Sequence, residues 1–226
     1  NHGMLEIFGR PNWWVIKNGS SQYISKLMRG FEDKIHLSWL VESISRLNDG
    51  AEIILSNDEK VLKFDAVIFA THSDQALKLL KDPNDLEVEI LNSFPYQKNE
   101  VLLHTDSSVL PKRKLAWASW NYQLDNDPSA PVILTYNMNI LQSIESEYTF
   151  CVTLNDDSSV DKEKVIKKIV YHHPLFTVDS IKSQKRKHEI SGVNNTYYCG
   201  AYWRNGFHED GVVSALDVCK QFGEVL

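Results

Sequence analysis

Residues 198–216 of the chain read YCGAYWRNGFHEDGVVSAL. The apolar start predicts a short strand, the polar middle a loop that carries glycines, and the end a helix from about Gly211 to Phe222. The first turn of a helix offers N–H groups and a partial positive charge, which suit a phosphate or an oxyanion. Glycine also lets a ligand approach the backbone closely. This segment is therefore the first candidate for a binding site.

The same segment resembles a known family. Cys199-Gly200-Ala201-Tyr202, followed by Gly206-Phe207-His208-Glu209-Asp210-Gly211, is similar to the C-terminal flavin-contacting segment of flavin-containing amine oxidases. The similarity is closest to their bacterial branch of predicted FAD/NAD(P)-binding oxidoreductases. Many amine oxidases have Gly-Glu where this chain has Gly200-Ala201, so the class of substrate stays open.

Further segments carry the resemblance along the chain in the same order as in the family. The first segments shared with the family are a Trp-bearing strand and turn, a Val-x-x-Ile segment and an Asp-x-Val-Ile-x-Ala-Thr strand. They correspond to Trp14–Tyr23, Val41–Ile44 and Asp65–Thr71. The middle of the chain matches the bacterial branch at Tyr96–Asn99, His104–Asp106, Trp117–Tyr122 and His173-Pro174.

The resemblance implies a set of cofactor-binding residues for FAD. It implies that Val41 lines the adenine portion. The residues that it implies around the ribityl and isoalloxazine portion are Gly200, Ala201, Glu209, Asp210, Gly211 and Val212. Glu209 and Asp210 have an alternative role as a simple helix cap. No catalytic residue is identified, because in flavin chemistry the cofactor carries the reacting centre.

The predicted fold class is α+β, with a partial α/β FAD-binding domain and an antiparallel-sheet substrate domain with flanking helices. Residues 1–80 are predicted to be the partial FAD-binding domain with a β-meander, 81–195 the substrate domain, and 196–226 the FAD-contacting strand, loop and helix. The chain has no G-x-G-x-x-G after a strand. We therefore expect the N-terminal Rossmann-like ADP-binding unit to be missing, and this chain alone to bind FAD weakly and to be inactive.

Local patterns predict several further elements. Trp13–Ile16 and Ile35–Trp39 are expected to be strands, and Asn48-Asp49-Gly50 a hairpin turn. The run Ala116–Tyr122 alternates as a strand would, with Trp117, Ser119 and Asn121 on one face. Lys162–Tyr171 is expected to be a helix and Thr177–Ile190 to be strand-like.

Aromatic residues gather in the expected substrate domain and indicate an apolar or amphipathic substrate. The candidate substrate-binding residues are Trp117, Trp120, Tyr122, Tyr136 and Tyr202. Each has an alternative role in core or sheet packing. His104 and Asp106 are either polar groups of the site or a strand-end cap.

Composition and spacing exclude several classes of protein. The chain has 226 residues, 42% hydrophobic content and a formal net charge of −6, which argues against a nucleic-acid partner. No run of apolar residues is long enough for a membrane span. The start has no signal peptide pattern, so we expect a cytoplasmic protein. Self-association is expected through the sheet edge that the missing unit would cover.

Metal and nucleophile chemistry have little support. Cys151, Cys199 and Cys219 lie far apart and form no CxxC pair, so buried reduced thiols are expected. The histidines and acidic residues lack the spacing of metal ligands, and no G-x-S-x-G motif is present. We expect an FAD-dependent oxidoreductase that takes a hydride from a small organic or apolar substrate. The alternatives are a non-catalytic binding or scaffold module and a flavoenzyme that acts on lipids or isoprenoids.

Overall fold

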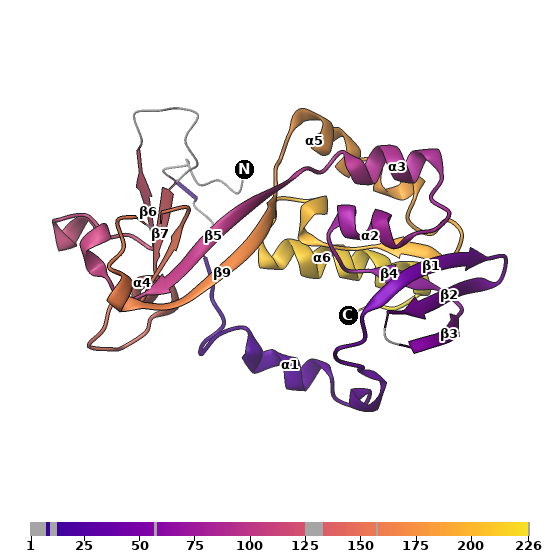
Figure 1. The fold of residues 1–226 in the computed structure, drawn as a ribbon, viewed down its shortest axis with the longest axis horizontal. Helices are drawn as coiled ribbons and strands as arrows, with labels where there is room; N and C mark the ends of the chain where they lie inside the picture. Colours follow the sequence, from indigo (N-terminus) through magenta and orange to yellow (C-terminus); the bar gives the residue numbers. More distant parts are fainter. Residues whose placement is uncertain (1–7, 10–12, 57, 125–132, 157, 226) are drawn as a thin grey trace. The chain divides into compact units, whose positions relative to one another are not determined.

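The computed structural model describes residues 8–9, 13–56, 58–124, 133–156 and 158–225. The chain forms two compact units (Figure 1). Unit 1 comprises Asn1–Lys34 and Lys98–His173, and unit 2 comprises Ile35–Gln97 and Pro174–Leu226. Helices and antiparallel sheets occur together, which confirms the α+β fold class. The functional division at 1–80, 81–195 and 196–226 stays a prediction.

The helices are α1 Ser21–Leu27, α2 Ser73–Leu79, α3 Asp85–Asn92, α4 Met138–Gln142, α5 Val178–Gln184 and α6 His208–Cys219. The strands are β1 Val41–Leu47, β2 Gly50–Leu55, β3 Asp58–Phe64, β4 Val67–Phe69, β5 Tyr96–His104, β6 Trp120–Gln123, β7 Ile133–Asn137, β8 Cys151–Leu154, β9 Val165–Pro174 and β10 Thr196–Tyr198.

Unit 2 contains the predicted meander, β1-β2-β3, and a two-stranded parallel sheet of β10 and β4. Leu47 pairs with Gly50 across the predicted hairpin turn. A Cβ on Gly50 would lie 2.2 Å from the carbonyl oxygen of Phe64, so no larger residue fits there. The parallel pairing of β4 agrees with its nearly continuous apolar sequence.

The core of unit 2 joins the meander, the parallel strands and the helices. Its buried members are Ile44, Ala51, Val67, Phe69, Ala76, Leu80, Ile90, Leu91, Phe94, Ile190, Tyr198, Tyr202 and Trp203. Val41 packs against this cluster from the start of β1. The residues around the C-terminal turn are therefore part of the same core as the meander.

Unit 1 is built on an antiparallel sheet with the order β6-β7-β8-β5-β9. Strand β9 replaces the helix that was predicted for Lys162–Tyr171, and only a 3-10 turn at Lys162–Lys164 precedes it. The helical spacing of its apolar residues was misleading, because Val165, Ile166, Ile169 and Val170 are β-branched and favour a strand. Strand β9 lies at the edge of the sheet, so it pairs with a single neighbouring strand there, β5.

Other local predictions were wrong in a similar way. The segment expected as a strand at Thr177–Ile190 forms α5 and a 3-10 turn at Lys187–Glu189. Thr177 and Ser180 make a reciprocal capping box, with N···O distances of 3.1 and 2.8 Å. Residues 13–16 and 35–39 form no strand. The C-terminal helix begins at His208, three residues before the predicted start.

Candidate functional site

The C-terminal site begins where β10 ends. Strand β10 pairs in parallel with β4, with Tyr198 opposite Phe69. The N–H of Cys199 continues the ladder and donates to the carbonyl oxygen of Phe69 at 2.9 Å. The chain then turns through Gly200 and a 3-10 helix, Ala201–Trp203, before α6. The structure thus confirms the strand, loop and helix order that the sequence predicts.

Gly200 is required by the turn itself. Its φ is +153°, and a Cβ there would lie 2.5 Å from Cε1 of Tyr202, because the tyrosine ring folds back over the turn. The N–H of Gly200 donates to Oγ of Ser214 on α6 at 3.1 Å. This bond fixes the turn on the helix.

The side chain of Asp210 holds the loop before α6 by hydrogen bonds to its backbone. Its side chain is buried, and Oδ2 accepts hydrogen bonds from the N–H groups of Asn205 (3.2 Å) and Phe207 (3.0 Å). Asp210 therefore caps the helix, and its contact with a cofactor stays a prediction. The amide of Gly211 bonds to the carbonyl oxygen of Phe207 at 3.3 Å, so the helix start lies before Gly211.

Most of the residues implied for flavin contact are accessible. Glu209 and Val212 are exposed, whereas Gly200, Ala201 and Gly211 are half-buried. Gly211 and Ala201 lie side by side, since a Cβ on Gly211 would meet Cβ of Ala201 at 3.9 Å. Small residues and the first turn of a helix thus share one accessible surface.

Two buried polar atoms lie next to this turn. The hydroxyl of Tyr202 and Nε1 of Trp203 have no hydrogen-bond partner within the described part of the chain. Burial raises the pKa of Tyr202 well above its usual value, so the phenol stays protonated. Polar groups that are left without a partner in a core are costly.

A buried ionic network behind the turn was missed by the sequence analysis. Glu87 on α3 is fully buried and accepts hydrogen bonds from Tyr198 Oη (2.8 Å) and Arg46 Nη1 (2.5 Å). Its other oxygen accepts from the N–H of Asn84 at 2.9 Å. Burial, and then the charge of Glu87, raise the pKa of Tyr198. The network ties β1, α3 and β10 together.

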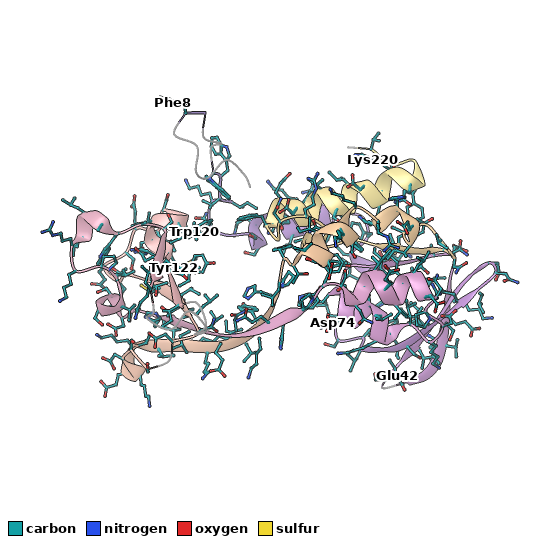
Figure 2. All side chains as sticks on the ribbon, turned by 90° about the horizontal axis from the view of Figure 1, so that it is seen from above. Phe8, Glu42, Asp74, Trp120, Tyr122 and Lys220 are labelled. Carbon is teal, nitrogen blue, oxygen red and sulfur yellow. The ribbon has the colours of Figure 1, made fainter. Side chains whose placement is uncertain are left out.

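The aromatic residues of unit 1 gather on one face of its sheet. Strand register pairs Trp120 with Tyr136 and Tyr122 with Leu134, so all four share a face. Trp120 is 40% exposed and Tyr122 58% exposed. Figure 2 shows these two labelled side chains on the same part of unit 1. We call this surface the aromatic face.

The other aromatic candidates lie elsewhere. Trp117 precedes β6 rather than belonging to it, and its Nε1 donates to the carbonyl oxygen of Pro111 at 2.7 Å. The prediction that Trp117, Ser119 and Asn121 share the face of one strand is therefore wrong. Tyr202 is buried in the core of unit 2. The structure brings together Trp120, Tyr122 and Tyr136 alone among the five.

His104 and Asp106 belong to a polar network of unit 1. Nδ1 of His104 accepts from the N–H of Asp106 at 3.1 Å, so Nε2 carries the proton and donates to Thr153 Oγ1 at 2.8 Å. Thr153 in turn bonds to Thr135 at 2.9 Å. Burial lowers the pKa of His104, which favours this neutral form. These bonds support the strand-end role.

Metal ligands and membrane helices are absent from the described ranges. No group of three His, Cys, Asp or Glu side chains there could hold a metal ion. No helix among those residues is long and apolar enough to cross a membrane. Cys151 and Cys199 are buried as predicted, but Cys219, at the end of α6, is exposed.

Comparison with known proteins agrees with this architecture. The model of the family "Flavin containing amine oxidoreductase" matches residues 3–137. No curated protein matches the sequence significantly.

Solved structures share the fold. A triple mutant of putrescine oxidase has a TM-score of 0.61 and 11% identity, over 91% of this chain and 53% of that chain. A fatty acid isomerase from P. acnes that produces CLA has a TM-score of 0.56 and 15% identity, over 81% and 47%. Cyclohexylamine oxidase from Brevibacterium oxydans IH-35A has a TM-score of 0.56 and 10% identity, over 91% and 53%. The chain thus spans about half the length of these structures.

Proposed function

Because the chain belongs to the family of flavin-containing amine oxidoreductases, we propose that it is part of an FAD-dependent oxidoreductase. In this proposal Gly200, Ala201, Glu209, Gly211 and Val212 contact the flavin portion, Asp210 holds their loop, and Val41 lines the adenine. The observation that carries it is the closeness of Ala201 to Gly211, which places two small residues at the accessible first turn of α6. When bound, FAD would supply the hydride acceptor.

The substrate is proposed to be a small organic molecule with an apolar body. The aromatic face supports this, because Trp120 and Tyr122 expose large apolar surfaces that a substrate could cover. A lipid substrate is the second candidate, since a fatty acid isomerase is among the structures with this fold. Exchange of Trp120 for Ala should raise KM for either class, whereas exchange of Trp117, which is bonded to Pro111, should not.

The visible absorption spectrum of the purified chain, with and without added FAD, tests the proposal. A bound, perturbed flavin spectrum would support the assigned surface. If the chain stays colourless while the complete gene product takes up FAD, the cofactor needs residues outside this chain and the proposal stands. A complete gene product that binds no flavin would refute it.

Self-association of the isolated chain is part of the same proposal. Ile68 on β4 is 49% exposed, in a parallel sheet of only two strands among the described residues. Such apolar surface favours contact between copies. Sedimentation at high concentration should show species larger than a monomer, and a single monomeric species would contradict this.

A further inference from the structure

The sequence has a basic run formed by Lys182, Lys185, Arg186, Lys187 and His188. Two of these side chains are half-buried, and Arg186 is paired with Glu89 and Glu189. Lys182, Lys185 and His188 are exposed, as the composition of the run would suggest. Lys187 is half-buried, and its Nζ donates to Oγ of Ser214 at 3.1 Å and to the carbonyl oxygen of Ser214 at 3.4 Å. The lysine therefore faces α6 rather than solvent.

Ser214 connects this ammonium group to the C-terminal turn. Its side chain is buried, and the same Oγ also accepts the N–H of Gly200 at 3.1 Å. Nζ of Lys187 lies 5.9 Å from the ring centroid of Trp203, which is the last residue of the 3-10 turn. Oγ of Ser214 thus links the ammonium group of Lys187 to the N–H of Gly200, whose backbone is proposed to contact the flavin.

The charge of Lys187 is not neutralised by an ion pair. Within the described residues no carboxylate lies within 4.0 Å of its Nζ, and the favourable charge of Asp217 acts from farther away. Burial lowers the pKa of Lys187, and the nearby Arg204 lowers it as well. A partly buried cation without a countercharge is costly, because its hydrogen bonds to neutral groups replace hydration only in part. A negative ligand at the turn would supply that charge.

We propose that Lys187 is a positioning residue for the flavin, which rests on the function proposed above. Through Ser214 it orients the N–H of Gly200, and its charge stabilises the negative charge that the ring gains on reduction. When bound, FAD would accept a hydride, one hydrogen with both electrons of a substrate C–H bond, and the substrate would leave as its two-electron oxidised cation or, after loss of a proton to water, as the neutral product. Lys187 exchanges no proton in this step. It acts as a fixed electrostatic group.

The test compares the affinities of oxidised and reduced FAD in the complete gene product. Lys187→Met keeps the aliphatic stem and removes the charge, and Lys182→Met is the matched control on the same run. Dissociation constants are measured in air and, for dithionite-reduced FAD, without oxygen. In Lys187→Met the ratio of the oxidised to the reduced constant should fall about tenfold, equal to a potential about 30 mV lower for a two-electron couple. The control should keep the ratio, and Lys187→Arg should restore most of it.

Two results would overturn the proposal, and they differ from each other. If Lys187→Met weakens both forms of FAD equally, Lys187 has a structural role only, and the proposed function stands. If the wild-type protein binds no FAD, both ideas fail. Should Lys187→Met not fold, Lys187→Gln, which can still donate to Ser214, gives the same comparison.

Discussion

The hydroxyl of Tyr198 donates a 2.8 Å hydrogen bond to the carboxylate of Glu87, although 111 positions separate the two residues. Both side chains are fully buried. The bond joins the last residue of β10 to helix α3, and it therefore fixes the strand from which the C-terminal turn starts.

Tyr198→Phe should destabilise unit 2, because it removes one partner from a buried carboxylate. We expect a loss of about 1.5–3 kcal/mol in the free energy of unfolding, the usual range for a bond to a charged group. Urea denaturation measures it. The control is Tyr197→Phe. The ring centroids of Tyr197 and Phe222 lie 4.6 Å apart, and this variant keeps the ring, so the free energy of unfolding should change by less than about 0.5 kcal/mol. Equal effects of the two variants would contradict the role of Glu87.

Gly50→Ala should destabilise the meander, because a Cβ at this site would lie 2.2 Å from the carbonyl oxygen of Phe64. The obstacle is backbone that is held in β3, so we expect a loss of about 3 kcal/mol. Gly223→Ala is the control: its φ is also positive, +80°, but a Cβ there would meet no atom within 4 Å. That variant should lose only about 1 kcal/mol. Thermal unfolding of both proteins distinguishes contact from backbone strain.

Gly211→Ala should separate stability from cofactor binding. The new methyl group would meet Cβ of Ala201 at 3.9 Å, an ordinary contact, so helix α6 should gain about 0.5–1 kcal/mol. On the proposed function, the same methyl group should obstruct the flavin and weaken FAD binding about tenfold, or 1.4 kcal/mol. Calorimetry and fluorescence titration of the complete gene product measure the two effects.

Cys219→Ser at the exposed end of α6 is the control for that variant and should change neither quantity. A stabilised Gly211→Ala protein with unchanged FAD affinity would place the cofactor elsewhere.

Asp106 should make the stability of unit 1 depend on pH. Burial alone would raise the pKa of this carboxyl, but the N–H groups of Asp161 and Ser108 and the ammonium group of Lys164 donate to it and hold the pKa well below its usual range. A depressed pKa stabilises the folded protein above the unfolded value of about 3.9. This stabilisation is lost as the pH falls from there toward the folded pKa.

Asp106→Asn should therefore be about 1–3 kcal/mol less stable than the wild type at pH 7, and the difference should shrink below pH 4. Denaturation curves at several pH values between 2 and 7 measure it. Asp179→Asn, which removes an exposed carboxylate, should follow the wild-type curve. A difference that stays constant with pH would show that the charge of Asp106 is not the cause.

Part of the fold follows directly from local sequence. Asn48-Asp49-Gly50 predicts the hairpin that Leu47 and Gly50 close, because few residues tolerate such a turn. The apolar run at 65–71 predicts a strand of a parallel sheet, and β4 pairs in parallel with β10. Thr177 and Ser180 also carried a capping signal, which the strand prediction for that segment overlooked.

Strand β9 could not be predicted from spacing, because its apolar residues suit a helix as well as an edge strand. The neighbour β5 decides between the two by offering its free backbone groups. In the same way, the register of β6 with β7 places Trp120 beside Tyr136, while a hydrogen bond to Pro111 holds Trp117 apart. Their aromatic character alone makes both tryptophans candidate substrate-binding residues, and it does not distinguish between them.

The sequence by itself determined the family resemblance and the order of strand, turn and helix at the C-terminus, because local backbone preferences act over a few residues. Only the tertiary structure decided which polar groups are buried together. Glu87 meets Tyr198 and Arg46, and Lys187 meets Ser214, across separations of 27 to 111 positions. Such pairs depend on burial, where an unsatisfied charge is costly, and burial exists only once the chain has folded.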